Sequence, residues 1–412
     1  MKRPILVLGV LLYACAAASA DGLKWVKCQQ SEFGEAGWAQ QAATWSADDA
    51  KKQATGLVHE RAKLATVKVG QLDIAVAIDA DKADAADTDA IRFNFAGKPD
   101  FDKSRSYPLR ISKSKANDNG KEFEQVVGQF GPIDVKIKVG DDEVPAILSG
   151  YYFRGASRRS LALRLLTARQ GDCALGDKKH AVRLIDTTSN LRHDDKTQPR
   201  KALGGPLTFE AGDAVIVDCG KGDFKGALAK GHYGQPILVD GKWWQITLDA
   251  KAGKLAAEES KDPTGTMWVK VDMPRWTMRL EGKKHKLIVS GGKEPVTVPA
   301  DSYRIEGYTL DQTAPGIVGG KASLTAGSWQ PAIRIEIEKG KQAEPKLGPP
   351  LTAKLTATPA GRDVRISMSF TDQAGMQIGS VVGEKGAVPD APRFTVVDES
   401  GKEVHKGTLE YG

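Results

Sequence analysis

The sequence predicts a mainly β protein, built from several small antiparallel sandwich-like or barrel-like modules with one short helical segment near the N-terminus. Short runs of alternating apolar and polar residues recur along most of the chain, which is typical of strands with one buried face. The 412 residues include 44 Gly and 20 Pro, which favours turns and short strands over long helices. Asp240-Gly241 stands between two apolar runs and indicates a two-residue hairpin turn.

The first segment, Met1–Ala20, has the features of a secretory signal peptide. Lys2 and Arg3 precede an apolar run, and Ala18-Ser19-Ala20 is a small-residue cleavage site. As an alternative, Leu12-Tyr13-Ala14-Cys15 resembles a lipobox, in which Cys15 would carry a lipid anchor. No later stretch reaches the ~18 apolar residues of a transmembrane helix. We therefore expect an extracytoplasmic protein: periplasmic, bound in the cell envelope, or secreted.

The best helix candidate is Ser46–Leu64. Ser46, with Asp49 three residues later, is similar to a capping box, and the apolar residues that follow have helical spacing. The length predicts two to four domains, and changes in pattern suggest where they begin and end. The expected divisions are a signal peptide (1–20), an N-terminal segment with the helix (21–65), a β module (66–170), a central β module with the hairpin (171–280), a small β module (281–340), a linker (341–350) and an immunoglobulin-like β module (351–412).

The expected strands follow from alternation between apolar and polar residues. Gly212-Asp213 is expected to form the turn between the strands Leu207–Phe209 and Val215–Val217. The strands are Leu72–Ile78, Ile91–Phe95, Ile133–Val139, Ser160–Leu166, Val182–Leu184, Leu207–Phe209, Val215–Val217, Leu287–Val289, Val296–Val298, Tyr303–Leu310, Ile333–Ile337, Val364–Phe370, Phe394–Val397 and Val404–Leu409.

A type I′ turn at Asp240-Gly241 would set the register of its hairpin. It would pair Leu238 with Trp243 and Ile237 with Trp244, so that the two tryptophans point to opposite faces. If one face is solvated, Trp243 or Trp244 is a candidate for binding a sugar ring or a partner. The alternative, which we favour, is that both pack in a core.

Two stretches resemble known bacterial modules. VTVPADSYRIEGYTL (Val296–Leu310) is similar to the strand–turn–strand of surface β domains of the PEGA or carboxypeptidase-regulatory type, and FTVVDESGKEVHKGTLEYG (Phe394–Gly412) resembles the last strands of immunoglobulin-like modules. More broadly, the chain is similar to exported bacterial proteins with several β domains. The resemblance implies an architecture and carries over no catalytic residue.

Calcium is the one cofactor that the sequence suggests. Asp186, Asn190, Asp194 and Asp195 place oxygen ligands at intervals similar to those of a calcium loop. Leu191 stands where the sharp turn of such a loop needs Gly, and no Glu occupies the twelfth position. A second acidic stretch between Asp79 and Asp89 could also gather carboxylates, and the alternative for both is ordinary solvated turns.

Catalytic motifs are each missing a required residue. Leu184–Thr187 begins like the aspartic-protease motif, but Thr188 replaces its Gly and no second motif follows. Three histidines, His180, His193 and His232, lie near two cysteines, yet their spacing matches no zinc or Cys–His motif. No catalytic residue is assigned.

The cysteines allow one disulfide in an exported chain. Cys28, Cys173 and Cys219 remain if the signal is removed, and a Cys173–Cys219 disulfide is one candidate. Buried unpaired thiols are the alternative.

The net charge of +7 is spread among interleaved acidic and basic residues, which argues against nucleic-acid binding. We expect an exported, non-catalytic structural or binding protein of the bacterial cell envelope or exterior, whose partner is another envelope protein or a polysaccharide. The alternatives are a secreted hydrolase with an unrecognised site and a calcium-dependent adhesive module.

Overall fold

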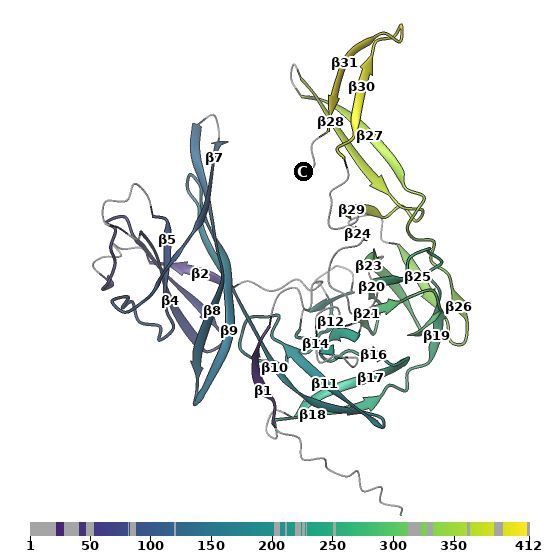
Figure 1. Ribbon diagram of the computed structural model, residues 1–412, viewed down its shortest axis with the longest axis horizontal. Helices are drawn as coiled ribbons and strands as arrows, with labels where there is room; N and C mark the ends of the chain where they lie inside the picture. Colours follow the sequence, from purple (N-terminus) through teal and green to yellow (C-terminus); the bar gives the residue numbers. More distant parts are fainter. Residues whose placement is uncertain are drawn as a thin grey trace, which may run out of the picture.

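The computed structural model describes residues 22–28, 41–46, 53–80, 82, 88–118, 121–201, 207–210, 212–218, 224, 227, 229–249, 253–311, 323–327, 333–360, 363–382 and 390–409. The fold is mainly β, as the alternating pattern predicts, and the sheets are antiparallel apart from the pairing of two short strands. Figure 1 shows them arranged as an open arc, with the N-terminal sheet at one end and the C-terminal hairpins at the other.

The largest sheet of the described chain, here the large sheet, has 13 strands. Its long strand β10 pairs with β9 through its first half and with β11 through its second half, so it crosses the expected module boundary at residue 170. The strands are β1 (Lys24–Lys27), β2 (Gln41–Trp45), β3 (Lys63–Val69), β4 (Leu72–Asp79), β5 (Ala90–Asn94), β6 (Ser106–Pro108), β7 (Arg110–Asp118), β8 (Lys121–Val139), β9 (Asp142–Arg154), β10 (Arg159–Leu175), β11 (Lys178–Ile185), β14 (Ala214–Val217) and β15 (Ala229–His232).

The second sheet, of eight strands in the described residues, forms the other half of the arc. It joins the expected modules 281–340 and 351–412 into one sheet, because β24 pairs with β29. Its strands are β20 (Arg275–Glu281), β21 (Lys286–Gly291), β23 (Asp301–Asp311), β24 (Ser323–Gly327), β25 (Arg334–Ile337), β27 (Thr352–Ala360), β28 (Asp363–Thr371) and β29 (Gln377–Val382).

Four smaller sheets complete the described chain. Strand β13 pairs with β12 and not with β14, so the hairpin expected around Gly212-Asp213 is wrong. The smaller sheets contain β12 (Gln198–Lys201) and β13 (Leu207–Glu210); β16 (Ile237–Val239), β17 (Lys242–Asp249) and β18 (Lys254–Glu259); β19 (Thr264–Met267), β22 (Val296–Pro299) and β26 (Gln342–Ala343); and β30 (Arg393–Val397) and β31 (Glu403–Thr408).

The Asp240-Gly241 hairpin forms with the predicted register. Leu238 pairs with Trp243 and Ile237 pairs with Trp244, and both turn residues have the positive φ that a type I′ turn requires. Both tryptophans are buried, however, so the proposal of a binding surface at Trp243 or Trp244 is wrong.

The reason is that β16 and β17 lie between two cores. Trp244 packs with Cys173 and Leu175 from the large sheet. Trp243 packs on the other side with Met267 and Trp276. A sheet that is covered on both faces has no solvent-exposed face. The alternation of residues within one hairpin does not show whether its second face is covered.

The helix expected over Ser46–Leu64 is wrong from Ala54 onward, while residues 47–52 lie outside the described residues. The chain turns at Gly56, whose φ is +72°, and the amides of Val58 and His59 donate to the buried carboxylate of Asp79 at 2.9 and 2.8 Å. These contacts replace helical hydrogen bonds before β3 begins.

The linker expected over Lys341–Pro350 is packed into the fold. Its residues Gln342–Ala343 form β26 beside β19, and Leu347 is buried in the core around Trp276. The amide of Gly348 donates to the Tyr308 hydroxyl at 3.0 Å. Strand β26 and the buried residues Leu347 and Gly348 therefore anchor the segment, although most of its other residues are exposed.

Candidate functional site

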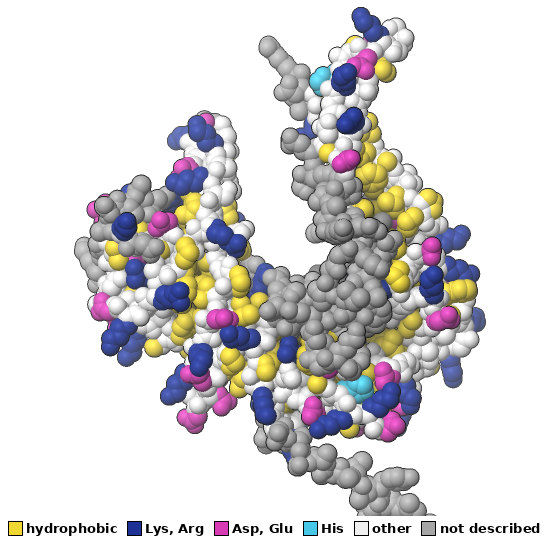
Figure 2. Space-filling view, in the orientation of Figure 1, with side chains coloured by type: hydrophobic (Ala, Val, Ile, Leu, Met, Phe, Trp, Pro, Cys, Tyr) yellow, Lys and Arg dark blue, Asp and Glu magenta, His cyan; other side chains and the backbone are white. Residues whose placement is uncertain are grey.

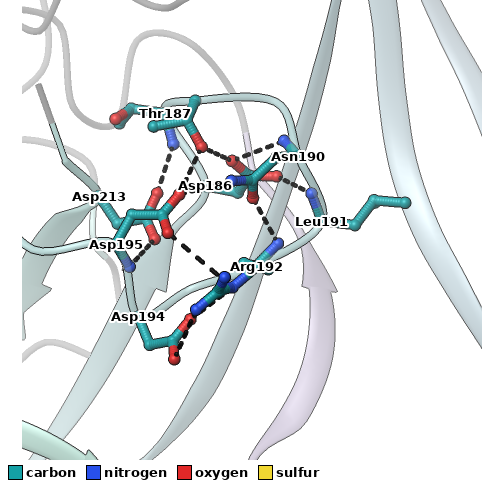
Figure 3. Close-up of polar contacts among 9 residues, drawn as sticks. Asp186, Thr187, Asn190, Leu191, Arg192, Asp194, Asp195 and Asp213 are labelled. Atoms are coloured by element: carbon teal, nitrogen blue, oxygen red, sulfur yellow. Dashed lines mark hydrogen bonds and ion pairs between the residues drawn. The ribbon is translucent and has the colours of Figure 1, made fainter. Parts of the chain in front are cut away.

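The densest polar cluster lies in the segment after β11, which we call the acidic loop (Asp186–Thr197; Figure 3). Asp186 is fully buried at its start. Its carboxylate accepts hydrogen bonds from the amides of Asn190 (3.2 Å) and Leu191 (2.6 Å). The carboxylate therefore holds the first turn of the loop, as an Asx-type side chain does.

A second buried carboxylate comes from Asp213, which directly precedes β14. It accepts hydrogen bonds from the amide of Thr187 at 3.2 Å and from the amide of Asp195 at 2.9 Å. Figure 3 shows Asp186, Asp195 and Asp213 in one cluster. Asp213 was not a candidate from the sequence, since nothing local links it to the acidic loop. Only the pairing of β14 with β11 brings it there.

Burial raises the pKa values of both carboxyl groups. Desolvation raises the pKa of Asp186 to about 6, although hydrogen bonds from Leu191 and Asn190 oppose the shift. Desolvation and the nearby charge of Asp186 raise the pKa of Asp213 to about 9. Two adjacent buried carboxyl groups thus retain a proton more readily than exposed ones.

A proton shared between two carboxyl groups is also the basis of aspartic-protease chemistry. Here both groups are fully enclosed, and their oxygens accept hydrogen bonds from the acidic loop's own backbone. Both side chains have no solvent-exposed surface from which a substrate could approach them. We therefore assign the pair to holding the acidic loop in place.

The predicted calcium residues Asp186, Asn190, Asp194 and Asp195 are brought together, but their polar atoms contact one another and Arg192. The side-chain amide of Asn190 donates to Asp195 at 2.5 Å, and Arg192 Nε donates to Asp194 at 3.1 Å. Among the described residues, no group of three His, Cys, Asp or Glu side chains is arranged to hold a metal ion. In the second acidic stretch, Asp79 binds Arg92, while residues 81 and 83–87 lie outside the described part.

The acidic loop is held from a second side by the turn between β3 and β4. Gly70 in that turn has a φ of +59°, and a Cβ built on it would lie 2.1 Å from the carbonyl oxygen of Asn190. The side-chain amide of Gln41 also donates to the carbonyl of Thr188 at 2.7 Å. Close backbone approach therefore requires glycine at position 70.

The Gly70→Ala variant should lose about 2 kcal/mol or more of unfolding free energy, because it combines a positive φ with a backbone clash. Gly140→Ala is the matched control: its φ is +60°, but nothing lies within 4 Å of its Cβ position. Urea denaturation of both variants measures the difference. Equal losses of unfolding free energy in the two variants would show that Gly70 does not closely contact the acidic loop.

The three histidines named in the sequence lie in separate environments. The His180 ring nitrogen Nδ1 lies 3.2 Å from the carbonyl oxygen of Asp218, and the His193 ring meets Trp25 edge to face at 5.1 Å. Desolvation lowers the pKa of His193 to about 3 and that of His232 to about 4. Burial thus keeps His193 and His232 neutral. His180 lies opposite Cys173 in the register of β10 and β11.

Of the two cysteines in the proposed Cys173–Cys219 disulfide, only Cys173 is among the described residues. Cys173 is a free, buried thiol and does not form the proposed disulfide. Desolvation raises the pKa of Cys173 to about 11, which makes it a poor nucleophile. Cys219, the signal segment 1–20 and the lipid-anchor candidate Cys15 lie outside the described residues.

A second charged cluster lies on strands β20, β21 and β23. Arg304 pairs with Glu281 at 2.5 Å and with Glu306 at 3.2 Å, and Lys286 pairs with Glu306 at 3.3 Å. The bulge between Arg279 and Leu280 makes room for Glu306. Burial and the neighbouring Glu306 raise the pKa of Glu281. The pairing of each acid with a cation indicates an internal network.

No helix in the described part of the chain is long and apolar enough to span a membrane. No protein-family model matches the chain, and neither does any curated protein or solved structure.

Proposed function

We propose that this chain is an exported, non-catalytic structural protein of the bacterial cell envelope or exterior, and that it self-associates through its C-terminal region. The observation that carries the proposal is an uncovered apolar face on the β27–β28 hairpin. Support for export comes from the signal-like residues at Met1–Ala20.

The β27–β28 hairpin is amphipathic, because over Thr352–Pro359 and Val364–Thr371 its two faces separate by residue type. Residues paired in register share a face, and alternate pairs point to opposite sides. One face carries polar residues alone: Thr352, Lys354, Thr356, Thr358, Arg365, Ser367, Ser369 and Thr371. The other, here the apolar face, carries Ala353, Leu355, Ala357, Pro359, Val364, Ile366, Met368 and Phe370.

The apolar face is not covered by the rest of the described chain. Leu355 is 57% exposed and Val364 is 59% exposed. Five of the six exposed large apolar side chains in the described residues lie between β27 and β31, with Tyr151 as the sixth. Figure 2 shows hydrophobic side chains gathered along this arm of the molecule. Apolar surface concentrated in this way marks an interaction site.

A second copy of the chain fits this face. The apolar face has no charged side chain, so two identical faces can meet without burying an unpaired charge. Strands of this length are about 30 Å long, and two hairpins stacked face to face would bury roughly 1,000 Å² in total. That area is at the lower end for specific interfaces and predicts a weak, concentration-dependent dimer. Lys354 and Pro359 disfavour the alternative of edge-to-edge strand pairing.

Analytical ultracentrifugation of the mature chain from micromolar to millimolar concentration tests the proposal. Wild type should dimerise, and Leu355→Asp or Val364→Asp should weaken the dimer at least tenfold, because a charge would enter an apolar interface. Thr356→Asp and Ser367→Asp on the opposite face are matched controls that should leave association unchanged. A wild type that stays monomeric, or equal losses for both faces, would refute self-association through the apolar face.

A further inference from the structure

A cleft of about 500 Å³ lies at the end of β5 and β6, in the large sheet and away from the acidic loop. Its walls come from the end of strand β5, from the segment between β5 and β6, and from Tyr107 of β6. Nothing in the proposed self-association uses this cleft.

Aromatic rings form the apolar part of the cleft. Phe95 lies nearly parallel to Phe93, with ring centroids 6.1 Å apart and planes at 20°. Tyr107 lies 6.0 Å from Phe93, and the Arg105 guanidinium lies over the Tyr107 ring, 5.5 Å from its centroid. Phe93 is buried and packs on Phe130, whereas Phe95 and Tyr107 are half-buried. The core thus holds the ring system, and half-buried Phe95 is the ring on which a ligand can stack.

The polar part of the cleft carries balanced charges. Asp100 and Asp102 oppose Lys103 and Arg105, so the lining has no net charge. Such a lining offers both hydrogen-bond donors and acceptors. It does not favour a phosphate, a polyanion or a cation, each of which needs an excess of the opposite charge.

The segment that carries the polar groups is held in place. Phe101 is fully buried within it. The Asn94 side-chain amide donates to the carbonyl oxygen of Asp100 at 2.5 Å, and the Asp100 carboxylate accepts from Thr55 at 2.9 Å and from the Asp102 amide at 3.1 Å. Because these contacts order the segment beforehand, a ligand would not have to bear the entropy cost of ordering it.

We propose that this cleft binds a neutral oligosaccharide. The C–H face of a sugar ring stacks on a half-buried aromatic ring such as Phe95. Sugar hydroxyl groups donate and accept hydrogen bonds, which suits a lining with Asp102 beside Lys103 and Arg105. The inference concerns a separate site, so it stands whether or not the chain self-associates.

The test is isothermal titration of the full mature chain with neutral hexasaccharides of glucose (α-1,4, β-1,4 and β-1,3 linked), xylose and N-acetylglucosamine. Polygalacturonate and chitosan oligomers serve as anionic and cationic probes. At least one neutral hexasaccharide should bind with a dissociation constant below about 1 mM, which is typical of small open sites. Charged probes should bind more weakly.

Variants assign any binding to the cleft. Phe95→Ala should weaken it at least tenfold. Asp102→Ala, an exposed change that leaves the core intact, should weaken it several-fold even if Phe95→Ala unfolds the module. Lys138→Ala, at an exposed position of β8, is the matched control and should bind as wild type does. The proposal is overturned if no neutral hexasaccharide binds at millimolar concentration, if a charged probe binds more tightly, or if Asp102→Ala binds as Lys138→Ala does.

Discussion

Replacing Trp243 by alanine is expected to lower the free energy of unfolding by about 3–5 kcal/mol, the range for removing a large aromatic side chain from a core. The side chain is 4% exposed and packs with Met267 and Trp276. Its indole N–H also donates to the carbonyl of Thr297 at 3.0 Å, which would lose its partner. Chemical denaturation followed by circular dichroism measures the loss.

The Trp244→Ala variant should cost a similar amount for a different reason, because this ring packs in the core beside Cys173 on the opposite face of β17. Trp268→Ala is the matched control. Trp268 is half-buried, with Lys270 4.3 Å from its ring centroid, and its loss should cost less than about 1.5 kcal/mol. If either buried variant cost no more than this control, β17 would not lie between two cores.

Between pH 6.5 and 8.5 the protein should become less stable as the pH rises, by up to about 1.4 kcal/mol per pH unit from Asp213. Burial and the charge of Asp186 raise the pKa of Asp213 from 3.8 to about 9 in the folded state. Across this window the folded state keeps a proton that the unfolded state has released. Raising the pH therefore favours unfolding.

The other groups with strongly shifted pKa values affect stability mainly outside the range pH 6.5–8.5. The lowered pKa values of His193 and His232 change stability in the opposite direction, but only below the ordinary histidine value of 6.5. The raised pKa of Asp186, about 6, has its effect mainly below the window, and that of Cys173, about 11, above it. Within pH 6.5–8.5 the slope thus reports mainly on Asp213.

The experiment is urea denaturation at several pH values across this window for wild type and Asp213→Asn. The variant should be less stable at pH 6.5, since an amide cannot accept from both Thr187 and Asp195 as the carboxyl group does. Its stability should also depend less on pH, because position 213 no longer titrates. Asp141→Asn, at an exposed turn, should keep the wild-type slope. A variant with the wild-type slope would contradict the assignment to Asp213.

Features that depend on neighbouring residues were predictable from the sequence. Alternation located strands such as Ile133–Val139, where buried apolar side chains interleave with exposed Asp134 and Lys136. The type I′ turn at Asp240-Gly241 gave the observed register, because two residues with positive φ allow one geometry that matches strand twist. The separation of the two faces over Thr352–Pro359 and Val364–Thr371 can likewise be read from the chain once the pairing of β27 with β28 is known.

The failures came from contacts between distant residues. Ser46–Leu64 has helical spacing, but Asp79 takes up the amides of Val58 and His59. The Lys- and Pro-rich segment Lys341–Pro350 suggested a linker, yet Leu347 fills a core formed mainly by residues before it. Alternation along β17 suggested one solvent-exposed face. That suggestion was wrong because the two faces of β17 are covered by different sheets.

The sequence by itself therefore determined the mainly β class, the hairpin register and strands such as Ile133–Val139 and Val364–Phe370, since period-two patterning and turn conformation are properties of adjacent residues. Only the tertiary structure decided which faces are covered, which carboxyl groups meet and which surfaces stay open. It buried Trp243 and Trp244, placed Asp213 against Asp186, and left Leu355 and Val364 exposed. Burial and electrostatic coupling depend on which segments the fold brings together, and distance along the chain does not encode that.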